Sequence, residues 1–214
     1  MFLRTAELKK EMTAALKSSG LVVGMLDGRY YVRGRNWGLY AECESVSNKF
    51  KGAVTELVGR LPEPGEINKY MQGKDGMQTE VYELKVYPYQ AWIAAKEGVR
   101  QTPVLLGVFP HVYTIFQRTG TLEPMAVRQA LINAISDKEL EEGETMPGQP
   151  SMSYGTLYWH NETTIYWAET ERMAEKVRDV LFPALMDVDF SADDWRKTQL
   201  GTDGTVEAEP LPYI

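Results

Sequence analysis

The stretch that decides the fold runs Gly155-Thr-Leu-Tyr-Trp-His-Asn-Glu-Thr-Thr-Ile-Tyr-Trp-Ala168 and continues Glu169-Thr-Glu-Arg-Met-Ala-Glu-Lys-Val-Arg-Asp-Val-Leu-Phe182. The first half is typical of a β-hairpin and the second of an amphipathic helix. A three-residue loop at 161–163 places Trp159 opposite Ile165 and Leu157 opposite Trp167, so the large apolar side chains share one face. The other face then carries Tyr158, His160, Thr164 and Tyr166.

The helix that follows this hairpin has one apolar stripe, formed by Met173, Val177, Val180 and Leu181. Thr170 is its predicted N-cap. Pro183 predicts an end near Phe182, because the residue before a proline is pushed out of the helical region.

A second hairpin is predicted near the N-terminus, where Asp27-Gly28 lies between two apolar runs and favours a type I′ turn. Its register pairs Met25 with Tyr30 and Val23 with Val32. A helix over 4–18 precedes it. A strand over 39–44 and a helix over about 50–61, capped by Ser47 or Asn48, follow it.

The middle of the chain is less regular. Residues 65–78 are predicted to form a loop and 79–87 a strand, and a short helix opens at Pro88. Strands are expected at 104–109 and 112–117, and a helix after Thr121. Residues 137–154 are acidic and then rich in proline, glycine and serine, which predicts a long exposed loop.

These elements predict an α+β protein with a mainly antiparallel sheet and helices packed on one face. We expect a single domain over 1–200 and a mobile acidic C-terminal tail over 201–214. The order helix, hairpin, helix recurs, so an internal αββα duplication is the alternative, with similar halves at 1–62 and 121–190 joined by a central sheet segment at 79–117. Such an order also recurs by chance in small α+β proteins.

The composition limits the classes of function. The chain has 214 residues and a net charge of −7, which argues against broad binding to nucleic acid or to an anionic membrane, although a local basic patch can exist. Cys43 is the only cysteine, so no intrachain disulfide is expected. No run of 18 apolar residues predicts a membrane span. We therefore expect a cytoplasmic protein that does not bind membranes.

The first candidate binding surface is the early hairpin. Arg29, Tyr31 and Arg33 share a face of it, and Arg35 and Trp37 follow in the next loop. Arginine charge beside aromatic rings suits a single nucleic-acid strand, which needs phosphate attraction and base stacking. The alternative is an ordinary outer sheet face with arginine stems along tyrosine rings, and the acidic total favours it.

The second candidate surface is the outer face of the late hairpin, with Tyr158, His160 and Tyr166. These side chains could line a ligand pocket, or they could pair across strands and support the sheet. His160 and His111 are the only histidines, and neither has an acidic partner at a familiar spacing, so no metal site is predicted.

Phosphate-loop and dinucleotide motifs are absent from the sequence. The run from Asp187 to Asp194 begins like a calcium loop, but Ala192 and Thr198 stand where that loop needs glycine and glutamate. A helix start capped by Ser191 is the better interpretation. No cofactor is therefore expected.

One resemblance covers about the first 66 residues. A helix, the Asp27-Gly28 hairpin, a strand and then Phe50-Lys-Gly-Ala-Val-Thr-Glu-Leu-Val-Gly-Arg-Leu-Pro62 are similar to part of a bacterial DNA sliding-clamp domain. The resemblance implies a ring that encircles DNA, which is compatible with an acidic outer surface.

Three functional hypotheses follow. The first is a non-enzymatic binding or assembly module that forms a homo-oligomer or binds a protein partner; we favour it because no catalytic motif is present. The second is a nucleic-acid-associated protein, single-strand binding or sliding-clamp-like, that uses the Arg/Tyr/Trp hairpin. The third is an enzyme with a His/Tyr site that forms no sequence motif.

Overall fold

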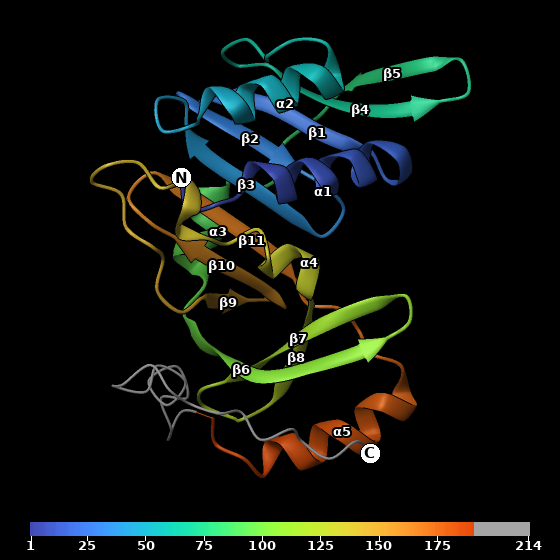
Figure 1. The fold of residues 1–214 in the computed structure, drawn as a ribbon, viewed down its shortest axis with the longest axis vertical. Coiled ribbons are helices and arrows are strands. Elements are labelled where there is room, and N and C mark those ends of the chain that lie inside the picture. Colours follow the sequence, from blue (N-terminus) through green and yellow to red (C-terminus); the bar gives the residue numbers. More distant parts are fainter. Residues whose placement is uncertain (191–214) are drawn as a thin grey trace.

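The computed structural model describes residues 1–190, and it confirms the predicted fold class (Figure 1). In this part of the chain, eleven strands form one antiparallel sheet in the order β5-β4-β1-β2-β3-β11-β10-β9-β6-β7-β8. The helices are α1 (Thr5–Ser18), α2 (Asn48–Val58), α3 (Pro88–Ala94), α4 (Gln129–Ile132) and α5 (Glu175–Met186). The strands are β1 (Leu21–Leu26), β2 (Arg29–Arg33), β3 (Trp37–Glu42), β4 (Ile67–Gly73), β5 (Gly76–Val81), β6 (Glu97–Val108), β7 (His111–Arg118), β8 (Pro124–Arg128), β9 (Ser151–Ser153), β10 (Thr156–His160) and β11 (Thr164–Glu169).

The early hairpin has the predicted register, with Met25 opposite Tyr30 and Val23 opposite Val32. Asp27 and Gly28 both have positive φ, 50° and 72°, as a type I′ turn requires. Ser47 caps α2, because its side chain accepts a hydrogen bond from the Phe50 amide at 3.2 Å. The helix ends at Val58, where the left-handed Gly59 stops it before the predicted end at 61.

The late hairpin differs from the prediction by one residue. Trp159 lies opposite Tyr166, and Tyr158 lies opposite Trp167, so the two tryptophans are on opposite faces. The side-chain oxygen of Asn161 accepts hydrogen bonds from the amides of Thr163 and Thr164, which stabilises a longer turn. The predicted register assumed one buried face, whereas this part of the sheet is buried on both faces.

Three other segments correct the sequence-based assignment. Residues 65–78, expected to be a loop, contain β4 and the start of β5. The helix expected after Thr121 is mostly β8, followed by the short α4. Thr170 does not cap α5; its hydroxyl donates to the Gly155 carbonyl at 3.0 Å, and α5 begins at Glu175. Pro183 lies inside α5, whose last turn is held by the buried Leu185.

Helices lie on both faces of the sheet rather than on one. α1, α2 and α4 cover the face that carries the main core, which includes Phe50, Leu131 and Tyr166. The opposite face carries a smaller cluster around Tyr31 and Trp167, covered by α3 and the segment after β5. α5 packs on a third cluster beside β7 and β8. Figure 1 shows α1, α2 and α4 in front of the strands and α3 behind them.

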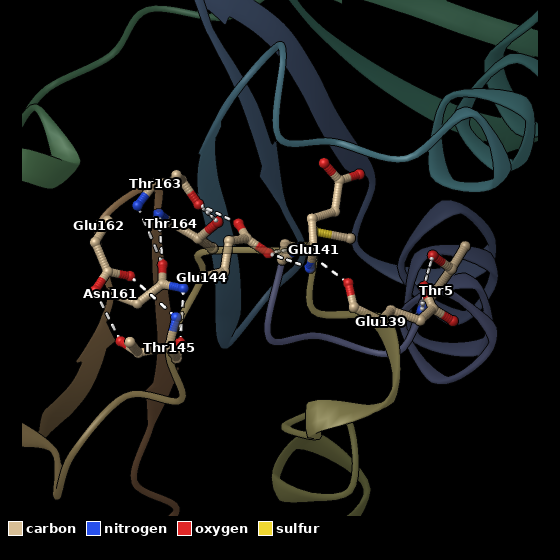
Figure 2. Close-up of polar contacts among 10 residues, drawn as sticks. Thr5, Glu139, Glu141, Glu144, Thr145, Asn161, Glu162, Thr163 and Thr164 are labelled. Atoms are coloured by element: carbon tan, nitrogen blue, oxygen red, sulfur yellow. Dashed lines mark hydrogen bonds and ion pairs between the residues drawn. The ribbon is translucent and has the colours of Figure 1, made fainter.

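The acidic segment expected to be a solvated loop is instead tied to the N-terminus and to the late hairpin (Figure 2). The Met1 ammonium pairs with Glu144 at 2.6 Å. Glu139 accepts hydrogen bonds from the Thr5 amide and hydroxyl, at 3.1 and 2.5 Å. Thr163 donates to Glu144 at 2.7 Å. These contacts join the N-terminus, the 139–144 segment and the turn of the late hairpin.

The internal αββα duplication stays a prediction. α1 is followed by three strands and α2, and α4 is followed by three strands and α5, so each half would be one helix, three strands and one helix. The predicted tail at 201–214 and the predicted helix start at Ser191 lie outside the described residues. Among residues 1–190, no helix is long and apolar enough to cross a membrane.

Candidate functional site

The early hairpin places Arg29, Tyr31 and Arg33 on one face, and α3 and the segment after β5 cover part of that face. Tyr31 is buried, and its ring lies tilted against that of Trp167 with the ring centres 5.9 Å apart. Burial raises the pKa of Tyr31 to about 12. Arg33 donates to the Tyr82 hydroxyl at 3.2 Å and pairs with Glu169 at 3.6 Å. Tyr31 therefore offers no free ring for base stacking, whereas the side chains of Arg29 and Arg33 stay 28% and 35% exposed.

Arg29 also contacts neighbouring side chains of the sheet. Its guanidinium pairs with Glu42 at 2.5 Å and lies 5.5 Å from the centre of the Tyr40 ring. The arrangement matches the alternative interpretation, in which arginine stems and tyrosine rings support each other on the sheet.

The late-hairpin set is divided between the two faces. Tyr166 is fully buried in the main core and donates to the Leu131 carbonyl at 3.0 Å, and burial raises its pKa strongly. Tyr158 and His160 lie on the opposite face, where His160 stacks on Trp92 at 3.9 Å. Burial, assisted by the positive charge of Arg29, lowers the pKa of His160. Tyr158, His160 and Trp92 line a small pocket of about 370 Å³ beside α3.

Arg35 and Trp37 belong to a different place, a pocket of about 500 Å³ that we call the arginine pocket. Its walls come from the C-terminal half of α1, the loop before β3, the segment after β11, and the ends of β7 and β8. Its polar lining includes Glu11, Arg35, Arg128, Glu171 and Arg172. Trp37 itself is buried, so it supports the wall and offers no free ring face for stacking.

The floor of the arginine pocket is a closed set of ion pairs. The Arg128 guanidinium lies 2.7 Å from a Glu11 oxygen and 3.3 Å from a Glu171 oxygen. Glu171 also accepts hydrogen bonds from the Asn36 amide at 3.0 Å and from the Tyr113 hydroxyl at 3.1 Å. Burial and the hydrogen bond to Glu171 raise the pKa of Tyr113. This set fixes five elements relative to one another.

The mouth of the pocket differs from the floor because, among the described residues, its arginines are not paired with carboxylates. Arg35 and Arg172 are both exposed, and within residues 1–190 neither forms an ion pair or hydrogen bond with an acidic group. His111 lies on the same wall, at the start of β7. A guanidinium presents several N–H donors in a fixed plane, which suits the oxygens of a phosphate or carboxylate. The mouth can therefore accept an anion above a floor in which Arg128 is already paired with Glu11 and Glu171.

Sequence reasoning missed most of this site. Glu11, Arg128 and the adjacent pair Glu171 and Arg172 come from three separate parts of the chain and form no local motif. Among the residues that line the pocket, only Arg35, Trp37 and His111 are considered for a functional role from the sequence alone. The other residues of the pocket could be identified only from the register of β3 with β11, because that pairing brings the 34–37 loop beside residues 169–171. In the described part of the chain, no group of three or more histidine, cysteine or acidic side chains could hold a metal ion.

The comparisons with known proteins found similar solved structures but no matching family. No family model matches the sequence, and no curated protein matches it. The chain is similar to solved DNA sliding clamps from Bartonella birtlesii, bound to griselimycin (5% identity, TM-score 0.33), and from Bacillus subtilis (7%, 0.33). A third neighbour is a putative DNA polymerase III β subunit from Eubacterium rectale (9%, 0.34).

The matches cover 82%, 80% and 84% of this chain and 66%, 64% and 66% of those chains. This chain thus spans about two thirds or less of the length of these neighbours. A likeness at this level does not assign a function to the chain.

Proposed function

We propose that this chain is a binding module that holds a phosphate-bearing ligand at the mouth of the arginine pocket. The supporting observation is a pair of exposed guanidiniums, Arg35 and Arg172, which come from different loops and have no acidic partner among the described residues. Guanidinium–phosphate hydrogen bonds are charge-assisted and often bidentate, so two arginines at one mouth form a directional anion site.

The floor supports this assignment. Because Arg128 is already neutralised by Glu11 and Glu171, it does not compete with the mouth for the ligand. The same contacts hold the surrounding loops in place, so the two mouth arginines have a rigid base. The net charge of −7 opposes non-specific binding, and contact with phosphate should therefore be confined to this local patch.

A free nucleotide and a nucleic-acid strand present the same phosphate chemistry. The test is fluorescence anisotropy with a 5′-labelled single-stranded oligothymidylate, with competition by AMP and by inorganic phosphate. Arg35→Ala combined with Arg172→Ala should weaken binding at least tenfold. The control is Lys51→Ala combined with Lys74→Ala, which removes the same charge elsewhere and should change little.

The outcomes separate the two sources. Binding of the strand that AMP displaces only weakly indicates nucleic acid, and equal binding of AMP alone indicates a nucleotide. Failure of the wild-type protein to bind any of the three probes would contradict the proposal. So would an equal loss of binding in the arginine and lysine variants, because only general charge would then matter.

A sliding-clamp-like role is the second candidate, and one observation favours it. α1 and α2 lie side by side across the sheet (Figure 1), and their exposed sides carry Lys10, Lys17 and Lys49. Lys10 pairs with Glu7 and Lys49 with Glu139, both at 2.8 Å. Exposed lysines on such a helical layer can contact the phosphate backbone of a duplex.

The clamp-like role has its own test. Protein that encircles DNA should remain on a closed circular duplex in high salt and leave after the circle is cut. Retention on circular and linear DNA that is equally salt-sensitive would reject encirclement. Lys10→Glu with Lys17→Glu should reduce loading, whereas Lys74→Glu with Lys85→Glu should not.

A further inference from the structure

The free edge of β5 is the feature that neither proposed function uses. In the sheet formed by residues 1–190, β5 is the last strand at one end, and all six of its residues are exposed. Figure 1 shows the β4–β5 hairpin extending beyond the helices that cover the rest of the sheet. An exposed strand edge offers unpaired backbone N–H and C=O groups to another strand.

The register shows which backbone groups are free. β4 and β5 pair with Gly73 opposite Gly76 and Tyr70 opposite Thr79, and the Tyr82 amide donates to the Ile67 carbonyl at 3.0 Å. Hydrogen-bonded pairs alternate along an antiparallel ladder, so Gln78 and Glu80 bond to β4. The backbone groups of Met77, Thr79 and Val81 therefore point away from the sheet.

The other end of the sheet is not equally open. β8 is the last strand there, but the segment after β11 covers it: the Glu171 amide donates to the Ala126 carbonyl at 2.8 Å, and the two residues form an isolated bridge. A head-to-tail contact between β5 of one copy and β8 of the next would have to displace this segment. A contact of β5 with itself would not.

We propose that β5 pairs with β5 of a second copy of this chain, antiparallel and about a two-fold axis at Thr79. In this register Met77 of each copy lies opposite Val81 of the other, and Gln78 of each copy lies opposite Glu80 of the other. The exposed apolar side chains, 42% for Met77 and 83% for Val81, then cover each other. About six interchain backbone hydrogen bonds would form, two for each hydrogen-bonded pair.

Neighbouring registers fit less well. An axis at Glu80 would put two carboxylates opposite each other, and like charges in directly opposed positions destabilise a sheet. An axis at Gln78 would place Val81 opposite Asp75 in the turn, which leaves its apolar surface uncovered. Of these three registers, only the axis at Thr79 places Met77 opposite Val81, and within Gly76–Val81 it places no like charges opposite each other. The Glu80 carboxylate is also already neutralised by Lys69 at 3.0 Å.

Charge-pair variants test both the contact and its register. Met77→Lys with Val81→Lys puts lysine opposite lysine, and Met77→Glu with Val81→Glu puts glutamate opposite glutamate. Each variant should be monomeric, and an equimolar mixture of the two should form a heterodimer. Met77→Glu with Val81→Lys is complementary to itself and should dimerise alone.

The measurement is sedimentation equilibrium across a hundredfold concentration range, with thermal melts to show that each variant is folded. The wild-type protein should show a reversible monomer–dimer equilibrium, and each like-charged variant should raise its dissociation constant at least tenfold. A wild-type monomer at every concentration would overturn the proposal. A dimer that persists in the Lys/Lys variant would show that another surface is used, and a monomeric Met77→Glu, Val81→Lys variant would overturn the register. None of these outcomes depends on the arginine pocket.

Discussion

The contact between the Met1 ammonium and Glu144 gives a direct test of how the 139–145 segment stabilises the protein. The change is Glu144→Gln, which keeps the size of the side chain and an acceptor for Thr163 but removes the negative charge. The two groups are 2.6 Å apart and are only 1% and 7% exposed, so water cannot replace the lost partner.

The expected loss follows from that burial. Removing one partner of a buried ion pair costs about 3 to 5 kcal/mol, because the other charge stays buried without compensation. The glutamine retains part of the hydrogen bonding, so we expect a loss of about 3 kcal/mol. In a protein of this size, 1 kcal/mol corresponds to about 2 to 4 °C in Tm, so the melting temperature should fall by roughly 6 to 12 °C.

The pH dependence of the same variant has a defined sign. Burial alone would raise the pKa of Glu144, but the hydrogen bonds from the Glu141 amide, the Met1 ammonium and Thr163 outweigh it, and the pKa lies below its ordinary value of 4.5. A carboxyl with a lowered pKa stabilises the fold above its unfolded-state value and loses that contribution as the pH falls through the folded value. The two proteins should therefore differ at pH 7 and converge towards pH 3.

The assay is urea and thermal unfolding of the wild-type protein and the variant, made with a free Met1 amine. Glu142→Gln is the matched control, because Glu142 is exposed in the same segment. The control should stay within about 0.5 kcal/mol of wild type. If Glu144→Gln loses no more than the control, or if its deficit does not shrink in acid, the ion pair does not hold this segment.

Three further predictions concern the sheet. Gly38→Ala should reduce stability by about 1 to 3 kcal/mol in urea unfolding, because the added Cβ would lie 2.0 Å from the Trp167 ring. A loss below about 0.5 kcal/mol would mean that the ring can move aside. Tyr166→Phe should cost about 1 kcal/mol by the same assay, since it leaves the buried Leu131 carbonyl without its donor. Burial raises the pKa of Tyr31 from 10.0 to about 12, so its neutral form stabilises the fold below pH 10 and that contribution is lost as the pH rises to about 12. Tyr31→Phe should therefore lose less stability than wild type between pH 10 and pH 12 in alkaline unfolding curves, and identical curves would contradict this.

The fold could be predicted where local chemistry determines it. Asp27-Gly28 specified both the turn and the register of the early hairpin, and Ser47 specified the start of α2. The late hairpin was wrong by one residue because its apolar pattern was interpreted for a sheet with one buried face. Both faces are buried, so Trp159 and Trp167 each have a core to enter, and the turn at Asn161 decides the register.

The candidate site could not be predicted in the same way, because its parts meet only through long-range pairing. Arg35 was a candidate from its aromatic surroundings, but its neighbours Arg128 and Arg172 depend on the packing of β8 and of the segment after β11. Conversely, Arg29 and Arg33 looked free in the sequence, whereas Glu42 and Glu169 neutralise them across strands. A pattern of charges along one strand does not show which of them the adjacent strand will satisfy.

The pairing of β3 with β11 has a consequence for synthesis of the chain. β3 ends at Glu42, and its partner β11 begins at Thr164, about 120 residues later. While the ribosome makes the intervening segment, helices α1 and α2 can already close over β1 to β4, but β3 remains an open edge. The nascent N-terminal third is therefore exposed to mispairing until the late hairpin emerges, and a chain truncated before residue 164 should associate wrongly through β3.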